Sequence, residues 1–130
     1  DHTDTALGLD YTVHYDNDQE TIFLFEASAI FGISERRRAE LSTFQRDVLV
    51  GFKHLFNDVM GSEFTTSLIV DMERDDERLL NLSFTRRLSD SWKFNTGLRL
   101  YHAPQKESVS TGLEFLHRDN HFFFNLSRYF

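Results

Sequence analysis

Serine, histidine and carboxylate side chains are numerous enough in this sequence to raise the question of nucleophilic catalysis. A hydrolase triad would draw on Ser28 or Ser110, on His14, and on Glu26 or Glu114. In such a triad the histidine takes the proton of the serine hydroxyl, and the carboxylate orients the imidazole. No motif ties these residues together, and the serines fit equally well as small side chains on the polar side of a strand. We therefore expect a protein that is not an enzyme.

The six histidines raise metal binding as a second chemistry. On a β-strand, two ligands share a face when they are two residues apart, and zinc sites often add cysteine. No two histidines have that spacing, and the chain has no cysteine. We expect no metal ion and no other cofactor.

The charge balance argues against nucleic acid as a partner. The formal net charge is −7, whereas a nucleic-acid-binding protein presents a basic face to the phosphates. The charged stretch ERRR at residues 35–38 could bind a lipid phosphate, and RDDE at residues 74–77 lacks the spacing of a calcium loop. Both stretches are more typical of charged turns between elements.

Alternation of apolar and polar residues with a period of two dominates the chain. Near the start, for example, Leu7 and Leu9 fall on one side of a strand and Asp10 on the other. Such segments predict about eight strands, at residues 6–15, 21–31, 44–56, 63–72, 79–88, 92–101, 109–117 and 121–130. Short polar segments separate the strands, so successive strands should form antiparallel hairpins within a single domain, residues 1–130.

Two all-β architectures produce this alternation. A soluble lipocalin-like barrel or a sandwich turns its apolar face inward and could bind a small apolar ligand. An up-and-down transmembrane β-barrel turns its apolar face to lipid and its polar face to the lumen. The 14 phenylalanines and the size of the side chains on the apolar face favour the transmembrane barrel.

The polar face combines small residues, including several glycines, with charges of both signs. A narrow lumen can pair such charges, whereas a solvated outer surface would not need the glycines. The side chains predicted to line the lumen are Asp10, His14, Glu26, Asp47, Lys53, Asp71, Arg87, Lys93, Arg99 and Glu114.

The last ten residues, HFFFNLSRYF, carry a more specific signal. This segment resembles the terminal strand of bacterial outer-membrane β-barrel proteins, which ends in an aromatic residue and is recognised by the barrel-assembly machinery. The residues that carry the resemblance are Phe122, Phe124, Leu126, Tyr129 and Phe130. Arg128 departs from the pattern, although an arginine near the rim can extend into the headgroups.

A wider resemblance covers residues 45–130, through the segments FNDVMGSEF, RRLSDSWKFNTGLRLY and NLSRYF. These segments are similar to the C-terminal region of uncharacterised, porin-like proteobacterial outer-membrane proteins. The resemblance implies the outer membrane of a Gram-negative bacterium as the location. It also implies outer-membrane lipid, lipopolysaccharide and the assembly machinery as partners.

Two barrel sizes fit these expectations. The strands could close into a narrow barrel of about eight strands, or form the C-terminal half of a barrel of about 16 strands, completed by its other half or by an oligomer. The expected function is a membrane scaffold or a narrow, passive pore for small solutes. The alternatives are a soluble binder of an apolar ligand and a barrel that carries a lipid-modifying hydrolase.

The resemblance also predicts an orientation and two aromatic girdles. If the C-terminus lies in the periplasm, an eight-strand order places SERRR, RDDE and APQKES there too. The opposite connections, which are short, would then face outward. Aromatic residues near strand ends should form girdles at the two membrane surfaces. The predicted girdle residues are Phe56, Trp92, Tyr101, Tyr129 and Phe130.

Overall fold

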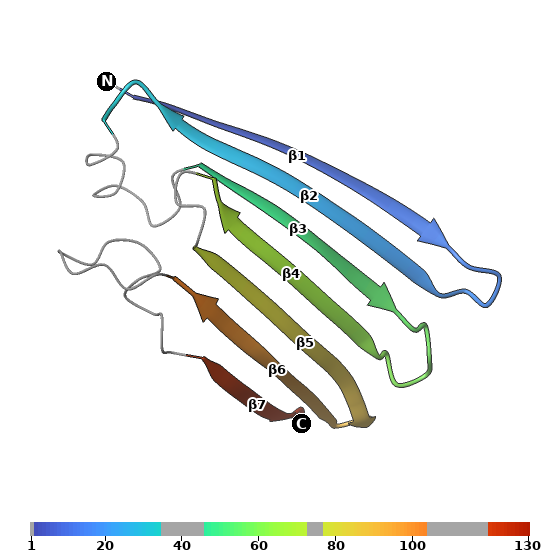
Figure 1. Ribbon diagram of the computed structural model, residues 1–130. Coiled ribbons are helices and arrows are strands. Elements are labelled where there is room, and N and C mark those ends of the chain that lie inside the picture. Colours follow the sequence, from blue (N-terminus) through green and yellow to red (C-terminus); the bar gives the residue numbers. More distant parts are fainter. Residues whose placement is uncertain (1, 35–45, 73–76, 104–119) are drawn as a thin grey trace.

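The computed structural model describes residues 2–34, 46–72, 77–103 and 120–130, and these form seven antiparallel strands in a single sheet (Figure 1). The strands are β1 (Thr3–His14), β2 (Glu20–Phe31), β3 (Arg46–Leu55), β4 (Glu63–Asp71), β5 (Arg78–Ser89), β6 (Trp92–His102) and β7 (His121–Arg128). No helix within the described ranges is long and apolar enough to span a membrane. The predicted all-β, up-and-down antiparallel arrangement is confirmed.

Each strand pairs with the next one along the chain, in the order β1 to β7. The strand predicted at residues 109–117 lies outside the described residues. No strand lies between β6 and β7, because these two pair directly, with Leu98 opposite Phe122.

The direct pairing of β6 with β7 changes which connections share an end of the sheet. Residues 15–19, 56–62 and 90–91 join strands at one end, which we call the turn end, and the C-terminus lies there as well (Figure 1). Residues 32–45, 72–77 and 103–120 connect strands at the opposite, loop end. The expected grouping of the C-terminus with SERRR, RDDE and APQKES is therefore wrong.

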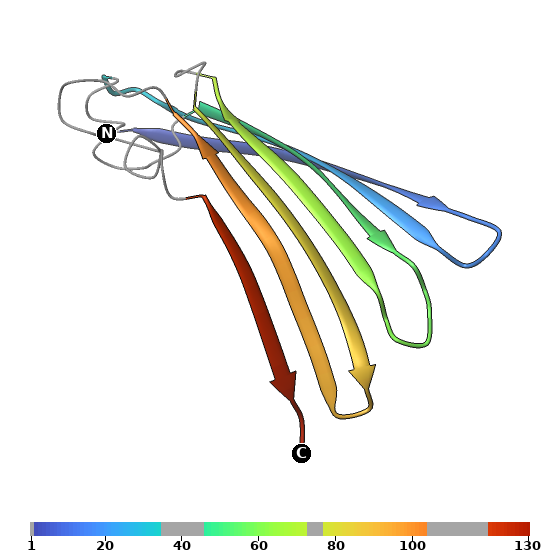
Figure 2. The same ribbon diagram turned by 60° about the horizontal axis from the view of Figure 1, so that its bottom comes forward.

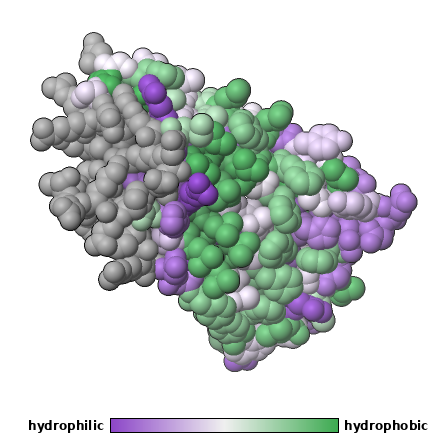
Figure 3. Space-filling model, viewed as in Figure 1, coloured by the Kyte–Doolittle hydropathy of each residue, from purple (hydrophilic) through white to green (hydrophobic). Residues whose placement is uncertain are grey.

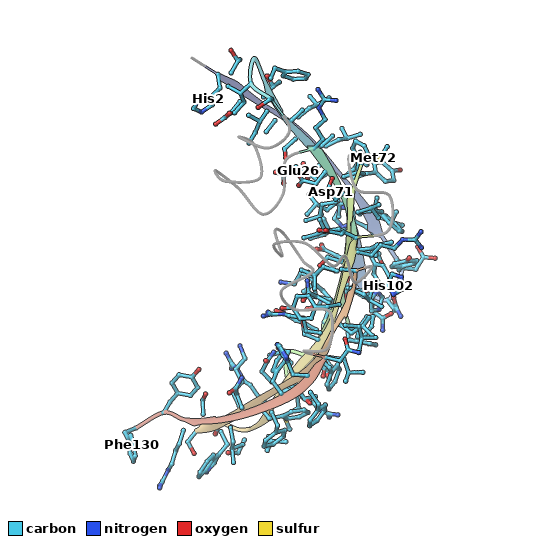
Figure 4. The ribbon with its side chains drawn as sticks, turned by 60° about the vertical axis from the view of Figure 1, so that its left-hand side comes forward. His2, Glu26, Asp71, Met72, His102 and Phe130 are labelled. Atoms are coloured by element: carbon cyan, nitrogen blue, oxygen red, sulfur yellow. The ribbon has the colours of Figure 1, made fainter. Side chains whose placement is uncertain are left out.

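The sheet is curved but not closed (Figures 2 and 4). Its edges, β1 and β7, do not pair with each other. Both edge strands run from the loop end to the turn end, so a direct contact between them would be parallel. These seven strands therefore do not close into a barrel by themselves.

The strand registers assign side chains to the two faces of the sheet as the alternation predicts. Directly paired residues share a face, and one row of pairs crosses all seven strands from Tyr11 to Phe122. Figure 4 shows Glu26 and Asp71 on the concave side, and Met72 and His102 on the convex side. The convex face therefore carries the apolar set and the concave face the polar set.

Burial in this single-layer sheet is inverted relative to a soluble domain. Among the described residues, the fully buried large side chains are two carboxylates, Asp71 and Glu77. Large apolar side chains on the convex face are exposed instead, for example Leu7 at 70%, Phe23 at 47% and Phe122 at 67%. Figure 3 shows apolar side chains gathered across this face. Soluble proteins rarely expose so large an apolar surface.

Candidate functional surfaces

The convex face carries no acidic side chain in any described strand, because every strand Asp and Glu points to the opposite face. Its arginines are confined to positions near strand ends. Arg46 and Arg78 begin their strands at the loop end, whereas Arg86 and Arg128 lie toward the turn end. The region between these two borders is uncharged.

The spacing of the borders gives the width of the uncharged band. On β3, Arg46 at the loop end is eight residues before His54; on β5, Arg78 is eight residues before Arg86. Eight residues span ~27 Å along a strand. At the strand tilt of about 30° derived below, this length corresponds to a band roughly 23 Å tall. The apolar band of outer-membrane barrels is ~25 Å tall.

The strand tilt follows from the register. In the row that joins Tyr11 to Phe122, Tyr11 is the fourth residue from the turn end of β1, whereas Phe122 is the second residue from the loop end of β7. The strand centres are therefore displaced by about five residues, or ~17 Å, across six interstrand steps that total ~29 Å. This displacement corresponds to a tilt of about 30°, slightly below the 35–45° typical of barrels.

An aromatic belt on the convex face takes one ring from each strand. Its members are Tyr11, Phe23, Phe52, Phe64, Phe84, Phe94 and Phe124. Four of its ring pairs are in contact, with centroids 6.3 Å apart for Phe23 and Phe52, 5.8 Å for Phe52 and Phe64, 5.7 Å for Phe84 and Phe94, and 6.2 Å for Phe94 and Phe124. Such pairs add about 0.5–1.5 kcal/mol each beyond the area that they bury.

The belt does not run along a row of directly paired residues. Its rings shift toward the turn end, as the strands themselves do. Tyr11, Phe23 and Phe52 share one row, whereas Phe64 and Phe84 face each other two residues closer to the turn end. The rings therefore stay near one level of the tilted sheet. An aromatic girdle at a membrane surface requires this arrangement, and the prediction from sequence missed these rings because their alignment depends on the register.

The predicted girdle residues divide between the two faces. Phe56 lies beyond the belt at the turn end of the convex face, with its ring 6.4 Å from that of Phe84. Trp92 is also convex, because it pairs with Arg128. Tyr101 shares the concave face with Arg99. The two residues after β7 also separate: Tyr129 lines a concave hollow beside Lys93, and the ring of Phe130 lies 4.9 Å from the Arg128 guanidinium.

On the convex face, the C-terminal strand presents three of the residues that were predicted to form an assembly signal. Phe122, Phe124 and Leu126 are 67%, 58% and 49% exposed. The Arg128 guanidinium lies over the Trp92 ring at 5.5 Å. Stacking on aromatic rings keeps this charge at the turn end of the face, where the apolar band ends.

A hydrogen-bonded cluster joins Tyr15, Thr21 and His54 at the turn end of the convex face. The buried hydroxyl of Thr21 lies 2.8 Å from His54 Nδ1 and donates to the Tyr15 hydroxyl at 3.2 Å. The sequence analysis did not identify this cluster, because its members come from two strands and a turn. Its polar atoms satisfy one another at the border of the apolar band.

The concave face brings the predicted lumen charges together. Asp10, His14, Glu26, Asp47, Lys53, Asp71, Arg87, Lys93 and Arg99 all lie on it by register. Glu114 lies outside the described residues. Two of these cations have partners on the same face: Lys53 Nζ pairs with Glu63 at 3.0 Å, and Arg99 Nε donates to Asn81 Oδ1 at 2.8 Å.

The residues proposed for a hydrolase triad do not meet among the described residues. The Ser28 hydroxyl donates to Asp47 at 2.7 Å, and His14 Nδ1 lies 3.0 Å from Glu20. Both contacts are on the concave face. His14 is opposite Glu20, however, and Glu20 is eight residues before Ser28 on β2. Eight residues separate His14 and Ser28 by ~27 Å along the strands. Ser110 lies outside the described residues. Within the described ranges, no cluster of three metal-ligating side chains occurs.

The turn at residues 56–62 is held by a carboxylate. Asp58 accepts hydrogen bonds from the Ser62 amide at 2.6 Å and the Ser62 hydroxyl at 2.7 Å. These bonds favour the ionised carboxylate and, with Arg86 nearby, hold the pKa of Asp58 below its ordinary value. Gly61 adopts a positive φ of 59° at the end of this turn, a conformation that suits glycine.

No protein family matches the chain, and no curated protein or solved structure is significantly similar to it.

Proposed function

We propose that this chain is part of an integral outer-membrane β-barrel, with the convex face against lipid and the concave face toward an aqueous lumen. The observation that carries the proposal is the uncharged convex band, bordered by arginines at both ends, with an aromatic belt inside it near the turn-end border. Lipid-facing arginine costs about 2–4 kcal/mol at the midplane but only 0–1 kcal/mol near the interfaces. The placement of Arg46 and Arg78 at one border and of Arg86 and Arg128 at the other agrees with that cost.

The curvature of the sheet supports the same proposal. A soluble lipocalin-like barrel would place its apolar side chains on the concave side, around an enclosed ligand. Here the concave side carries Glu26 and Asp71, and the convex side carries the exposed apolar set (Figure 4). The function that we propose is accordingly non-enzymatic: a membrane scaffold or a passive conduit for small solutes.

The orientation in this proposal follows from the C-terminus. If Phe130 lies on the periplasmic side, as its resemblance to terminal barrel strands implies, the short turns 15–19, 56–62 and 90–91 are periplasmic. The connections 32–45, 72–77 and 103–120 then face outward, toward lipopolysaccharide, and two of them, 32–45 and 103–120, are longer than any turn on the periplasmic side. Short periplasmic turns and longer outer loops are the usual arrangement of these barrels.

Strand direction constrains how the barrel is completed. Because β1 and β7 run in the same direction, antiparallel closure requires an odd number of further strands. We propose that these strands come from another part of the chain or from a second copy. The mass of the protein in detergent, determined by native mass spectrometry, separates a closed monomer from an oligomer.

Insertion itself is tested by refolding the full chain into phospholipid vesicles that contain brominated lipids. Trp92, the sole tryptophan, lies at the turn end of the convex face. Its fluorescence should be quenched strongly by bromines near the headgroup and weakly by bromines at the bilayer centre. The folded protein should also migrate differently on a gel before and after boiling. A chain that remains in solution, unquenched, would refute the membrane proposal.

A further inference from the structure

The charges of the concave face are segregated by strand. In the described strands, all the acidic side chains of this face are on β1 to β4, at Asp4, Asp10, Glu20, Glu26, Asp47, Glu63 and Asp71. The strands β5, β6 and β7 contain no aspartate or glutamate, and their concave face carries Arg87, Lys93 and Arg99. One side of the proposed lumen is therefore acidic and the other is basic.

Two of these cations lie in a position that is unfavourable without a ligand. Arg87 and Lys93 are directly opposite each other on β5 and β6. Like charges in directly opposed positions of an antiparallel pair destabilise it. Within the described part of the chain neither residue has an ion-pair partner, whereas Lys53 on the acidic side is paired with Glu63.

A hollow of about 510 Å³ adjoins this pair. Its polar lining comes from three adjacent strands, with Lys93 opposite Ser127, and Asn95 between Thr85 and Asn125. Tyr129 also lines this hollow. This lining supplies hydroxyl and amide groups around one ammonium and includes no carboxylate side chain.

A second hollow, of about 380 Å³, lies beside the first and shares Lys93 and Tyr129 with it. Arg87 and Ser89 contribute to its lining, together with Asp90, the acidic residue of the β5–β6 turn. Arg87 and Lys93 thus line the second hollow together.

We propose that these adjoining hollows bind a small oxyanion of the phosphate or carboxylate class, held between Arg87 and Lys93. Hydrogen bonds from the neutral amides and hydroxyls of the lining would complete its coordination. An oxyanion relieves the repulsion between the two cations and accepts charge-assisted hydrogen bonds from both. This inference deepens the proposed function, because it assumes that the concave face is aqueous and assigns anions as the class of solute that this side of the barrel would attract.

The test is a titration of the full chain, refolded in zwitterionic detergent, with inorganic phosphate at constant ionic strength. Backbone amide signals are followed by NMR. Saturable shifts are expected at residues 85–95 and 125–129. Lys93→Gln should weaken binding by about tenfold or more, since a hydrogen bond to a charged group is removed. Lys93→Arg should retain binding.

The matched control is Lys53→Gln, which removes a cation from the acidic side of the same face and should leave phosphate affinity unchanged. The anion site is overturned if the amide signals do not shift, or if the Lys93→Gln variant binds phosphate like wild type. If the protein still migrates differently on a gel before and after boiling, the membrane proposal stays intact. If the chain is instead soluble without detergent, the membrane proposal fails. The same titration in buffer then decides the anion site, because β5, β6 and β7 form the hollow.

Discussion

Val50 lies midway along the convex face of β3, four residues from Arg46 and four from His54, and its side chain is 51% exposed. Four residues correspond to ~13 Å along the strand and, at a tilt of about 30°, to ~11 Å in depth from either border. If the convex face meets lipid, Val50 is therefore close to the bilayer midplane.

Replacing Val50 with arginine separates the lipid environment from water. At the midplane the arginine should lower the free energy of unfolding by about 2–4 kcal/mol. In a soluble protein the same exposed position would accept arginine within about 0.5 kcal/mol. The control is Thr3→Arg, an exposed convex position at the loop end of β1, where the interfacial cost is 0–1 kcal/mol.

The measurement is urea-induced unfolding from phospholipid vesicles, followed by Trp92 fluorescence, for wild type and both variants. The decisive quantity is the difference between the two variants, because both add the same side chain to the same face. Equal stabilities for Val50→Arg and Thr3→Arg would refute the assignment of the convex face to lipid.

Three further predictions concern the sheet and its turns. A Cβ at position 97 would collide with a backbone carbonyl and lie 2.6 Å from an aromatic ring of β7. Gly97→Ala should therefore destabilise the fold by about 1–3 kcal/mol in the same assay. Gly8→Ala, whose nearest atom would be 3.9 Å away, should be tolerated, and equal losses would contradict the packing argument. Asp58 has a lowered pKa, so its contribution to the turn is complete above the ordinary carboxyl range and is lost as the pH falls through its folded-state value. The amide shift of Ser62 should report that titration, and Asp58→Asn should abolish it. Thr21→Val removes a buried hydroxyl that contacts an imidazole and a phenol, and a cost of about 1 kcal/mol is expected by urea unfolding. An unchanged midpoint would show that the cluster adds nothing to stability.

Alternation within each strand was readable from the sequence because the side-chain period of a strand is two, whatever the strand pairs with. This local property sufficed to separate Leu7 and Leu9 from Asp10, and to place Lys93 and Arg99 on one face. The antiparallel hairpins followed from the short polar turns. The predicted all-β class and the composition of each face therefore needed no tertiary information.

The tertiary structure decided everything that depends on which strands are neighbours and in what register. The pairing of β6 with β7 reversed the expected grouping of the C-terminus with the connections, because a single strand more or less inverts direction at the end of a meander. The aromatic belt, the Lys53–Glu63 pair and the opposed cations Arg87 and Lys93 arise between neighbouring strands, from pairings that the strand register sets. A pattern with a period of two excludes register shifts of one residue but does not distinguish shifts of two, so only the assembled sheet reveals these contacts.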